Sequence, residues 1–207
     1  TVVILTGGID LSVGSIIGLT NSVASRITTD DSMSRVWVAG FACLFIGAIC
    51  GLVNGLIVAY GRLQPIIVTL ATTSVYAGIA LYVRPTPAGD FPFEATQYWT
   101  GSMAFRDWPR GAVWLVLLVG IWLVFRRTRL ATSIVAIGSS EGAAFMSGLN
   151  VIRAKILAYT ISGTAAGAAG FYLTAQTGNG NALSGQTYML NTIAAVVLGG
   201  ANLAGGA

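Results

Sequence analysis

Charged residues are scarce in this chain, and histidine is absent. Only 9% of the 207 residues are charged, whereas a typical soluble domain has about 25%, and 55% are hydrophobic. This composition argues against a water-soluble fold and predicts a protein that lies in the lipid bilayer. With no histidine, a single lysine (Lys155) and isolated acidic residues, no catalytic constellation can be assembled. We therefore expect that the chain is not an enzyme by itself.

Cysteine is also rare. Cys43 and Cys50 lie in one apolar run, where a helix would place them on one face but too far apart for a disulfide. We expect both to be inert packing residues. The formal net charge of +4 does not indicate nucleic-acid binding, because the basic residues are scattered between apolar runs instead of clustering on one surface.

Long apolar runs are what the chain does contain. A helix needs about 20 mostly apolar residues to cross a membrane, and five or six runs are candidates. We predict an all-α integral membrane protein, a polytopic helix bundle with at least one broken helix. The predicted spans are residues 2–25, 36–60, 66–83, 111–125, 156–175 and 187–200. No signal-peptide layout is found, and both ends fall in apolar or glycine-rich sequence, so we expect one transmembrane domain over 1–207, truncated at both ends.

Residues 84–110 are predicted to be a loop. This segment holds four of the five prolines, which break helices, together with aromatic residues that suit the membrane interface. Those residues are Pro85, Pro87, Pro92, Pro109, Phe91, Phe93, Tyr98, Trp99, Phe105 and Trp108.

The basic residues predict the orientation, since cytoplasmic loops carry an excess of them. If segment 126–155 is cytoplasmic, the eleven basic residues divide six inside and five outside. The inside residues are Arg62, Arg126, Arg127, Arg129, Arg153 and Lys155, and the outside residues are Arg26, Arg35, Arg84, Arg106 and Arg110. Three of the inside arginines directly follow a predicted span, which favours this orientation.

Glycines recur at four-residue spacing within three of the predicted spans. Each set gives one helix a smooth face on which another helix can pack closely, and such faces would equally suit helices that shift during transport. The glycines are Gly47, Gly51 and Gly55, then Gly163 and Gly167, and then Gly14 and Gly18.

Asp10 is the only acidic residue inside a predicted span. An ionisable group in lipid is costly unless it faces protein or a water-filled cavity. It follows Gly7 and Gly8 and precedes Ser12, so the backbone can break there and the carboxylate can bond the hydroxyl and the freed amides. Two interpretations remain open: a cap that starts a new helix, or a residue that lines or gates a pathway.

A faint copy of this feature occurs near the other end of the chain. Residues 7–14 align with residues 199–206, with Asp10 opposite Asn202, and an apolar run precedes each stretch. Transporters often contain internal repeats, so a second broken helix is one explanation, and chance matching of glycines is the other.

Segment 126–155 is the longest polar stretch on the predicted inner side. Its middle predicts a short helix that begins at Ser139 or Ser140 and ends at Gly148. Such a helix could dock into a partner protein or lie on the lipid surface. The residues predicted to form this segment are Gly138, Ser140, Glu141, Ala143, Ala144, Gly148 and Leu149.

Four stretches, in order, resemble the ribose-type permease family of bacterial ATP-binding cassette (ABC) importers. They are LTGGIDLSVGS (residues 5–15), GLVNG with QPIIVTL (51–55 and 64–70), AIG to GLNV (136–138 and 148–151) and IAAVVLGG (193–200). The resemblance covers nearly the whole chain and implies an incomplete fragment of a multi-pass permease in the bacterial inner membrane. The residues expected on the pathway or at the broken helix are Gly7, Gly8, Asp10, Ser12, Asn54 and Asn202.

The resemblance also implies partners. It predicts two cytoplasmic ATP-binding subunits, a second permease chain and a periplasmic sugar-binding protein, with 84–110 as a periplasmic loop and 126–155 as a cytoplasmic coupling segment. Around Glu141 the chain departs from the family: Gly142 replaces a common acidic residue and Phe145 a common arginine. No cofactor is expected, because no Gly-Lys-Ser or Gly-Lys-Thr of a phosphate loop occurs and ATP would bind to a partner.

The predicted function is therefore translocation of a pentose or hexose by alternating access, driven by a partner ATPase. The main alternative is an ion-coupled secondary transporter or channel for a small polar solute. That alternative predicts several intramembrane carboxylates or histidines, and only Asp10 qualifies. A membrane enzyme is a third possibility, for which the sequence offers no reactive site.

Overall fold

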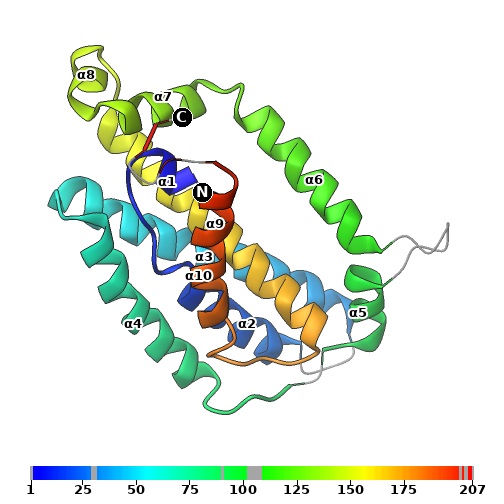
Figure 1. Ribbon diagram of the computed structural model, residues 1–207. Coiled ribbons are helices and arrows are strands. Elements are labelled where there is room, and N and C mark those ends of the chain that lie inside the picture. Colours follow the sequence, from blue (N-terminus) through cyan, green and yellow to red (C-terminus); the bar gives the residue numbers. More distant parts are fainter. Residues whose placement is uncertain are drawn as a thin grey trace.

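The computed structural model is a bundle of helices (Figure 1). It describes residues 2–28, 32–89, 91–101, 109–200, 202 and 205–206. The helices are α1 Val2–Leu5, α2 Val13–Ile27, α3 Met33–Gly61, α4 Pro65–Val83, α5 Phe93–Thr100, α6 Arg110–Phe125, α7 Arg129–Ser139, α8 Glu141–Met146, α9 Val151–Thr177 and α10 Gln186–Leu198. The predicted all-α membrane fold is confirmed.

Three helices in the described part of the chain, α3, α4 and α9, are long and apolar enough to cross a membrane. At 1.5 Å per residue, the 29 residues of α3 extend about 43 Å and the 27 residues of α9 about 40 Å. Helices α6 and α7 would form a fourth span only as a pair bent by 77°. The expectation of a full span at 187–200 is wrong, because the 13 residues of α10 reach only about 20 Å.

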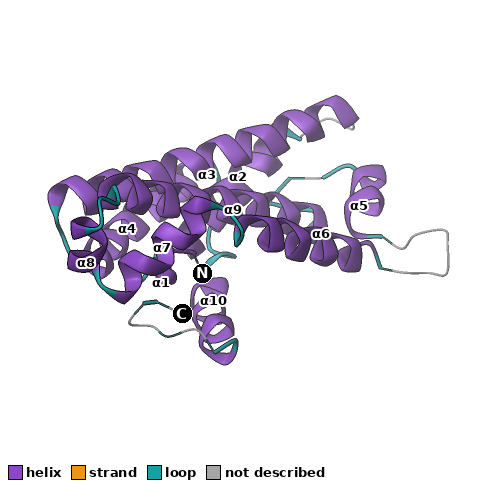
Figure 2. Ribbon diagram, turned by 90° about the horizontal axis from the view of Figure 1, so that it is seen from above, coloured by secondary structure: helices purple, strands orange, loops and turns teal. Residues whose placement is uncertain are grey.

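The core forms around α2, which packs against α3, α4 and α9 (Figure 2). Eleven of its fifteen residues are buried, although several of them are polar. These hydroxyls bond to carbonyls of their own helix: Thr20 to Ile16 at 2.9 Å and Ser22 to Gly18 at 2.9 Å. Internal bonding of this kind lets a serine-rich helix occupy an apolar interior.

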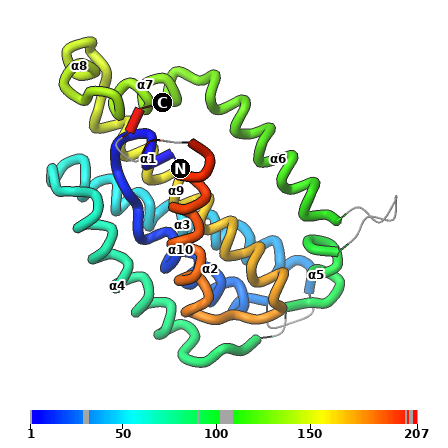
Figure 3. Tube along the Cα trace, in the orientation of Figure 1, coloured from blue at the N-terminus to red at the C-terminus, as the bar shows by residue number. Residues whose placement is uncertain are grey.

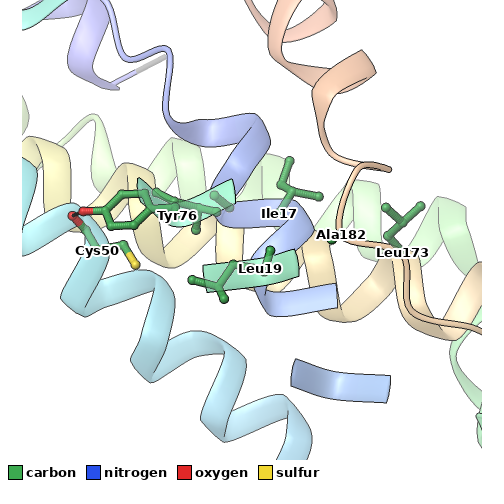
Figure 4. Packing of buried hydrophobic residues seen from close by; sticks show 9 residues of the cluster. Ile17, Leu19, Cys50, Tyr76, Leu173 and Ala182 are labelled. Carbon is green, nitrogen blue, oxygen red and sulfur yellow. Dashed lines mark hydrogen bonds between the residues drawn. The ribbon is translucent and has the colours of Figure 1, made fainter. Parts of the chain in front are cut away.

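An apolar cluster joins α2 to its neighbours (Figure 4). Ile17 and Leu19 of α2 meet Leu173 of α9, Ala182 of the following turn and Tyr76 of α4, whose hydroxyl reaches the backbone of Cys50. Cys43 and Cys50 are both buried and free, as expected from their position in an apolar run.

Two long helices, α3 and α9, make the most extensive contact, and glycines line it. A Cβ at Gly47 would meet the Gly163 carbonyl, and a Cβ at Gly167 would meet the Cys43 carbonyl. A Cβ at Gly51 would meet the Tyr159 carbonyl. The backbones therefore approach so closely that no side chain fits between them.

Gly14 and Gly18 differ from the other glycines. A Cβ at Gly18 would meet the Ala182 carbonyl, in the turn at residues 182–185, while a Cβ at Gly14 would lie 2.7 Å from the Gly185 carbonyl oxygen and 3.0 Å from Met189 Cβ of α10. The expected packing of a helix is therefore found at Gly14, which lies against the start of α10, whereas Gly18 lies against the turn that precedes α10. Asn21 holds the same turn: its Oδ1 accepts a hydrogen bond from the Asn181 amide at 2.6 Å.

The predicted loop 84–110 contains an unexpected helix, α5, which begins directly after Pro92. Proline suits the start of a helix, where its missing amide costs nothing, so the proline-rich composition concealed this element. Trp99 of α5 stacks on Trp114 of α6 with 4.8 Å between ring centroids. Phe105, Arg106 and Trp108, which the predictions included, lie outside the described residues.

Two loops and the end of α2 meet at one end of the bundle. The Arg84 guanidinium donates to the Ser25 carbonyl at 2.8 Å, and Ala88 pairs with Gly180 in an isolated antiparallel bridge. Burial and the nearby Arg26 lower the pKa of Arg84. Loop 84–89 and the turn after α9 are thus attached to the same end of α2.

Candidate functional site

The break between α1 and α2 is the structural centre of the candidate site. Helix α1 ends at Leu5, and Gly7 follows with φ of 77°, a left-handed conformation that glycine adopts without strain. Gly8 has a different role, because a Cβ there would lie 3.0 Å from the Tyr159 hydroxyl oxygen. The chain then runs without helical structure to Ser12, and α2 begins at Val13.

Asp10 lies in this break and is only 8% exposed. Its Oδ1 accepts hydrogen bonds from the Ser12 amide at 3.0 Å and the Ser12 hydroxyl at 2.6 Å. Its Oδ2 accepts one from the Ser162 hydroxyl of α9 at 3.2 Å. Three donors therefore surround the carboxylate, and Oδ1 has more partners than Oδ2.

A chain of hydrogen bonds extends from Ser12 to two further helices. Asn54 of α3 donates from Nδ2 to the Ser12 hydroxyl at 2.8 Å, and its Oδ1 accepts from the Tyr76 hydroxyl of α4 at 3.2 Å. Asn54 and Ser12 are fully buried. The structure thus brings the predicted residues Asp10, Ser12 and Asn54 together in one polar network and adds Tyr76 and Ser162, which the sequence analysis missed.

Two threonines of α4 supply partners to the unwound backbone. The Leu11 amide donates to the Thr69 hydroxyl at 3.1 Å, and the Thr73 hydroxyl donates to the Leu11 carbonyl at 3.1 Å. An unpaired backbone N–H or C=O group in an apolar interior costs roughly several kcal/mol. These hydrogen bonds avoid that cost at the break between α1 and α2. The sequence did contain a signal for these contacts: Thr69 and Thr73 are four residues apart on a predicted span, so their hydroxyls lie on the same face of the helix.

A cavity of about 230 Å³ adjoins the break. Residues from α1, the break, the first turns of α2, the middle of α9 and α10 line it, and Figure 3 traces these segments from blue to red. Its wall is mainly aliphatic and includes Ala165 and Ala169. The polar lining side chains are Asp10, Ser162 and Thr192.

The predicted second break after α10 has a related geometry. Gly200 has φ of 84°, and its amide donates to the Val197 carbonyl at 3.0 Å, just as the Gly7 amide donates to Ile4 at 2.9 Å. Gly7 and Gly200 thus share a left-handed backbone conformation and a hydrogen bond to the carbonyl three residues earlier, although the predicted alignment places Gly7 opposite Gly199. The Asn202 carbonyl accepts from the Gly205 amide at 3.1 Å, while Ala201, Leu203 and Ala204 lie outside the described residues.

The predicted coupling segment forms two helices, α7 and α8, at one end of the molecule (Figure 1). Ser140 is the N-cap of α8, and its hydroxyl accepts from the Ala143 amide at 3.3 Å. Gly148 ends the segment with φ of 78°, and the Leu149 amide bonds the Ala144 carbonyl at 3.1 Å. The expected short helix is present, whereas α7 was not predicted.

Individual residues of the coupling segment differ in exposure and contacts. Ala144 is buried, while Phe145 and Met146 are 70% and 86% exposed. Glu141 forms an ion pair with Lys155 of α9 at 2.7 Å. Gly138 lies inside α7, where a Cβ would meet the Leu5 carbonyl, so it allows α7 to approach α1.

Comparison with known proteins gives a match over the whole chain. The family model described as "Branched-chain amino acid transport system / permease component" matches residues 1–207. This match confirms that the sequence motifs resemble those of transport permeases.

Curated relatives agree with this match. The chain is 39% identical over 211 residues to the ribose import permease protein RbsC of Escherichia coli (strain K12), covering 100% of this chain and 65% of that protein. It is 36% identical over 209 residues to RbsC of Bacillus subtilis (strain 168), covering 100% and 64%. It is 31% identical over 206 residues to the D-allose transport system permease protein AlsC of Escherichia coli (strain K12), covering 98% and 62%. The chain thus spans less than two thirds of these relatives' length, and no solved structure matches it.

Proposed function

Because this chain belongs to the family of branched-chain amino acid transport system permease components, we propose that it is a membrane-spanning subunit of an ABC importer for a monosaccharide. The match of the family model to every residue carries the part of the proposal that makes the chain a transport permease. The names of the relatives, ribose import permease and D-allose transport system permease, support a pentose or hexose as the substrate.

The proposed mechanism is alternating access in the bacterial inner membrane. The broken helix at Asp10 lies among α3, α4 and α9 and is held by hydrogen bonds rather than by continuous helical backbone. Hydrogen bonds of this kind can be exchanged as helices move, whereas a continuous helix is stiffer. The glycine-lined contact between α3 and α9 supports the proposal in a different way, because it gives the bundle one tightly packed pair around which other helices can move.

The proposal assigns ATP binding to partners and no cofactor to this chain. Two cytoplasmic ATP-binding subunits would contact α7 and α8, a second permease chain would complete the pathway, and a periplasmic sugar-binding protein would deliver the sugar. In this arrangement segment 126–155 is cytoplasmic and 84–110 is periplasmic. The exposed side chains of Phe145 and Met146 support a partner contact at α8.

The test is reconstitution of the full-length permease in liposomes with its ATP-binding subunits and binding protein. We expect ATP-dependent accumulation of D-ribose or D-allose and co-purification of the permease with an ATP-binding subunit. Uptake that proceeds without ATP, or that requires a sodium or proton gradient, would instead support an ion-coupled transporter and refute the proposal.

A further inference from the structure

The cavity beside Asp10 carries an inference about ligand chemistry. We infer that it is a subsite for a neutral, hydroxyl-rich molecule of monosaccharide size, with the Asp10 carboxylate accepting a hydrogen bond from a ligand hydroxyl. This inference rests on the proposed function, since it names the part of the chain that the transported sugar would contact.

The first argument is the hydrogen-bonding character of the three polar groups in the cavity wall. The Ser162 hydroxyl donates its proton to Asp10 Oδ2, and the Thr192 hydroxyl donates its proton to the Met189 carbonyl at 2.8 Å. Asp10 Oδ2 has a single protein donor and retains lone-pair capacity. All three oxygen atoms can therefore accept hydrogen bonds from a ligand, while the protons of the two hydroxyls are already engaged.

The second argument is size. The cavity of about 230 Å³ equals the liquid volume of roughly eight water molecules and is smaller than the range of about 300–1,000 Å³ for drug-sized ligands. A molecule of about ten heavy atoms with several hydroxyls suits this space. The small side chains of Ala165, Ala166 and Ala169 form an apolar strip along α9 that suits the C–H face of a sugar ring.

The third argument is charge. Among the residues that the structure describes, no lysine or arginine lines the cavity, so an anionic ligand would find no compensating group there. Within the described residues no cluster of three acidic, cysteine or histidine side chains suits a metal ion, and Asp10 is the one carboxylate in the cavity wall. A neutral ligand with hydroxyl groups can donate hydrogen bonds to the acceptor oxygens in the cavity wall, and burying it costs less desolvation energy than burying an ion.

Cavity filling tests the subsite in the reconstituted full-length complex. We expect Ala165→Leu to lower the maximal rate of D-ribose uptake at least about tenfold, because the larger side chain occupies the ligand's volume. Ala168→Leu is the matched control: Ala168 lies on the same helix, is exposed and does not line the cavity. Equal uptake by the two variants would overturn the subsite.

Asp10→Asn separates the ligand contact from the structural contacts. The amide oxygen can still accept from Ser12, and the amide nitrogen can donate to the Ser162 oxygen when that hydroxyl reverses. The same nitrogen presents a donor to the cavity in place of an acceptor. We expect the complex to assemble with the wild-type yield and uptake to fall about tenfold, the order expected when a hydrogen bond to a charged acceptor is lost. Normal uptake by this variant would refute the role of Asp10.

A chemical readout avoids reliance on transport rates. In a full-length background with Cys43→Ala and Cys50→Ala, we expect Ala165→Cys to react with a water-soluble methanethiosulfonate reagent during ATP turnover, and D-ribose delivered by the binding protein to slow that reaction. An unreactive Ala165→Cys, or reactivity that D-ribose leaves unchanged, overturns the subsite. If the wild-type complex moves D-ribose with ATP while these tests fail, only the subsite is wrong; if it moves neither sugar, the proposed function itself fails.

Discussion

The ammonium group of Lys155 at the start of α9 lies 2.7 Å from the carboxylate of Glu141 at the start of α8. Lys155 is the only lysine of the chain, and its side chain is 20% exposed, whereas that of Glu141 is 58% exposed. The pair connects the short helix α8 to a long membrane-spanning helix. Glu141 thus forms an ion pair within its own chain. It would contribute to a partner contact indirectly, by holding α8 in place.

Neutralising this ion pair should affect coupling more than stability. We expect Glu141→Gln and Lys155→Met each to lower sugar-stimulated ATP turnover of the reconstituted complex, and the double variant to be no worse than either single one, because both remove the same contact. An exposed pair stabilises by about 1 kcal/mol or less, so the thermal midpoint of the permease should change little. Arg153→Gln, on the same turn of α9, is the control. Additive losses in the double variant would contradict a role of the Glu141–Lys155 ion pair in coupling.

Gly148 ends the coupling segment in a left-handed conformation, with φ of 78°. A side chain there costs about 1–2 kcal/mol, so we expect Gly148→Ala to distort the turn after α8 and to lower sugar-stimulated ATP turnover while the protein stays in the membrane. Gly142→Ala is the matched control, because a Cβ at that position would meet no described residue within 4 Å beyond its own turn of helix. Equal turnover by the two variants would show that the shape of this turn does not matter for coupling.

Gly51 tests the close contact between α3 and α9. A Cβ at this position would lie 2.9 Å from the Tyr159 carbonyl carbon and 3.0 Å from the Thr160 Cα, and both are backbone atoms that cannot rotate away. We expect Gly51→Ala to destabilise the detergent-solubilised full-length permease by about 1–3 kcal/mol, measured by thermal unfolding. Gly78→Ala on α4 has no neighbour within 4 Å of its Cβ and should leave the midpoint unchanged. If the Gly51→Ala variant unfolds at the same temperature as the wild type, α3 and α9 are not tightly packed at Gly51.

Tyr76 tests the polar network that extends from the break. Its hydroxyl group lies within hydrogen-bonding distance of two acceptors, the Cys50 carbonyl oxygen at 3.0 Å and Asn54 Oδ1 at 3.2 Å. We expect Tyr76→Phe to cost about 1–3 kcal/mol in thermal unfolding, because Asn54 is left buried with an unpaired oxygen. Tyr82→Phe, at a side chain that is 89% exposed on the same helix, should have no effect. Equal midpoints for the two variants would show that the network does not stabilise the break.

Much of the architecture could be predicted from local sequence. Apolar runs near 20 residues predict the spans at α3, α4 and α9, because the thickness of the bilayer fixes the length of a crossing helix. The break at Gly7 and the end of α8 at Gly148 were also predictable, since few residues other than glycine adopt such backbone conformations. Composition did not predict α5, because the prolines that suggested a loop also suit the start of a helix.

The partners of Asp10 required the tertiary structure. The sequence determined that this carboxylate is a costly group in a membrane and that Ser12 is near enough to bond it. Only the packing of α9 against α2 brings Ser162, 152 residues away, to its other oxygen, and only α3 and α4 complete the network through Asn54 and Tyr76. Spacing along a chain fixes contacts within one helix, whereas contacts between helices depend on which faces pack together, and several packings satisfy the same apolar pattern.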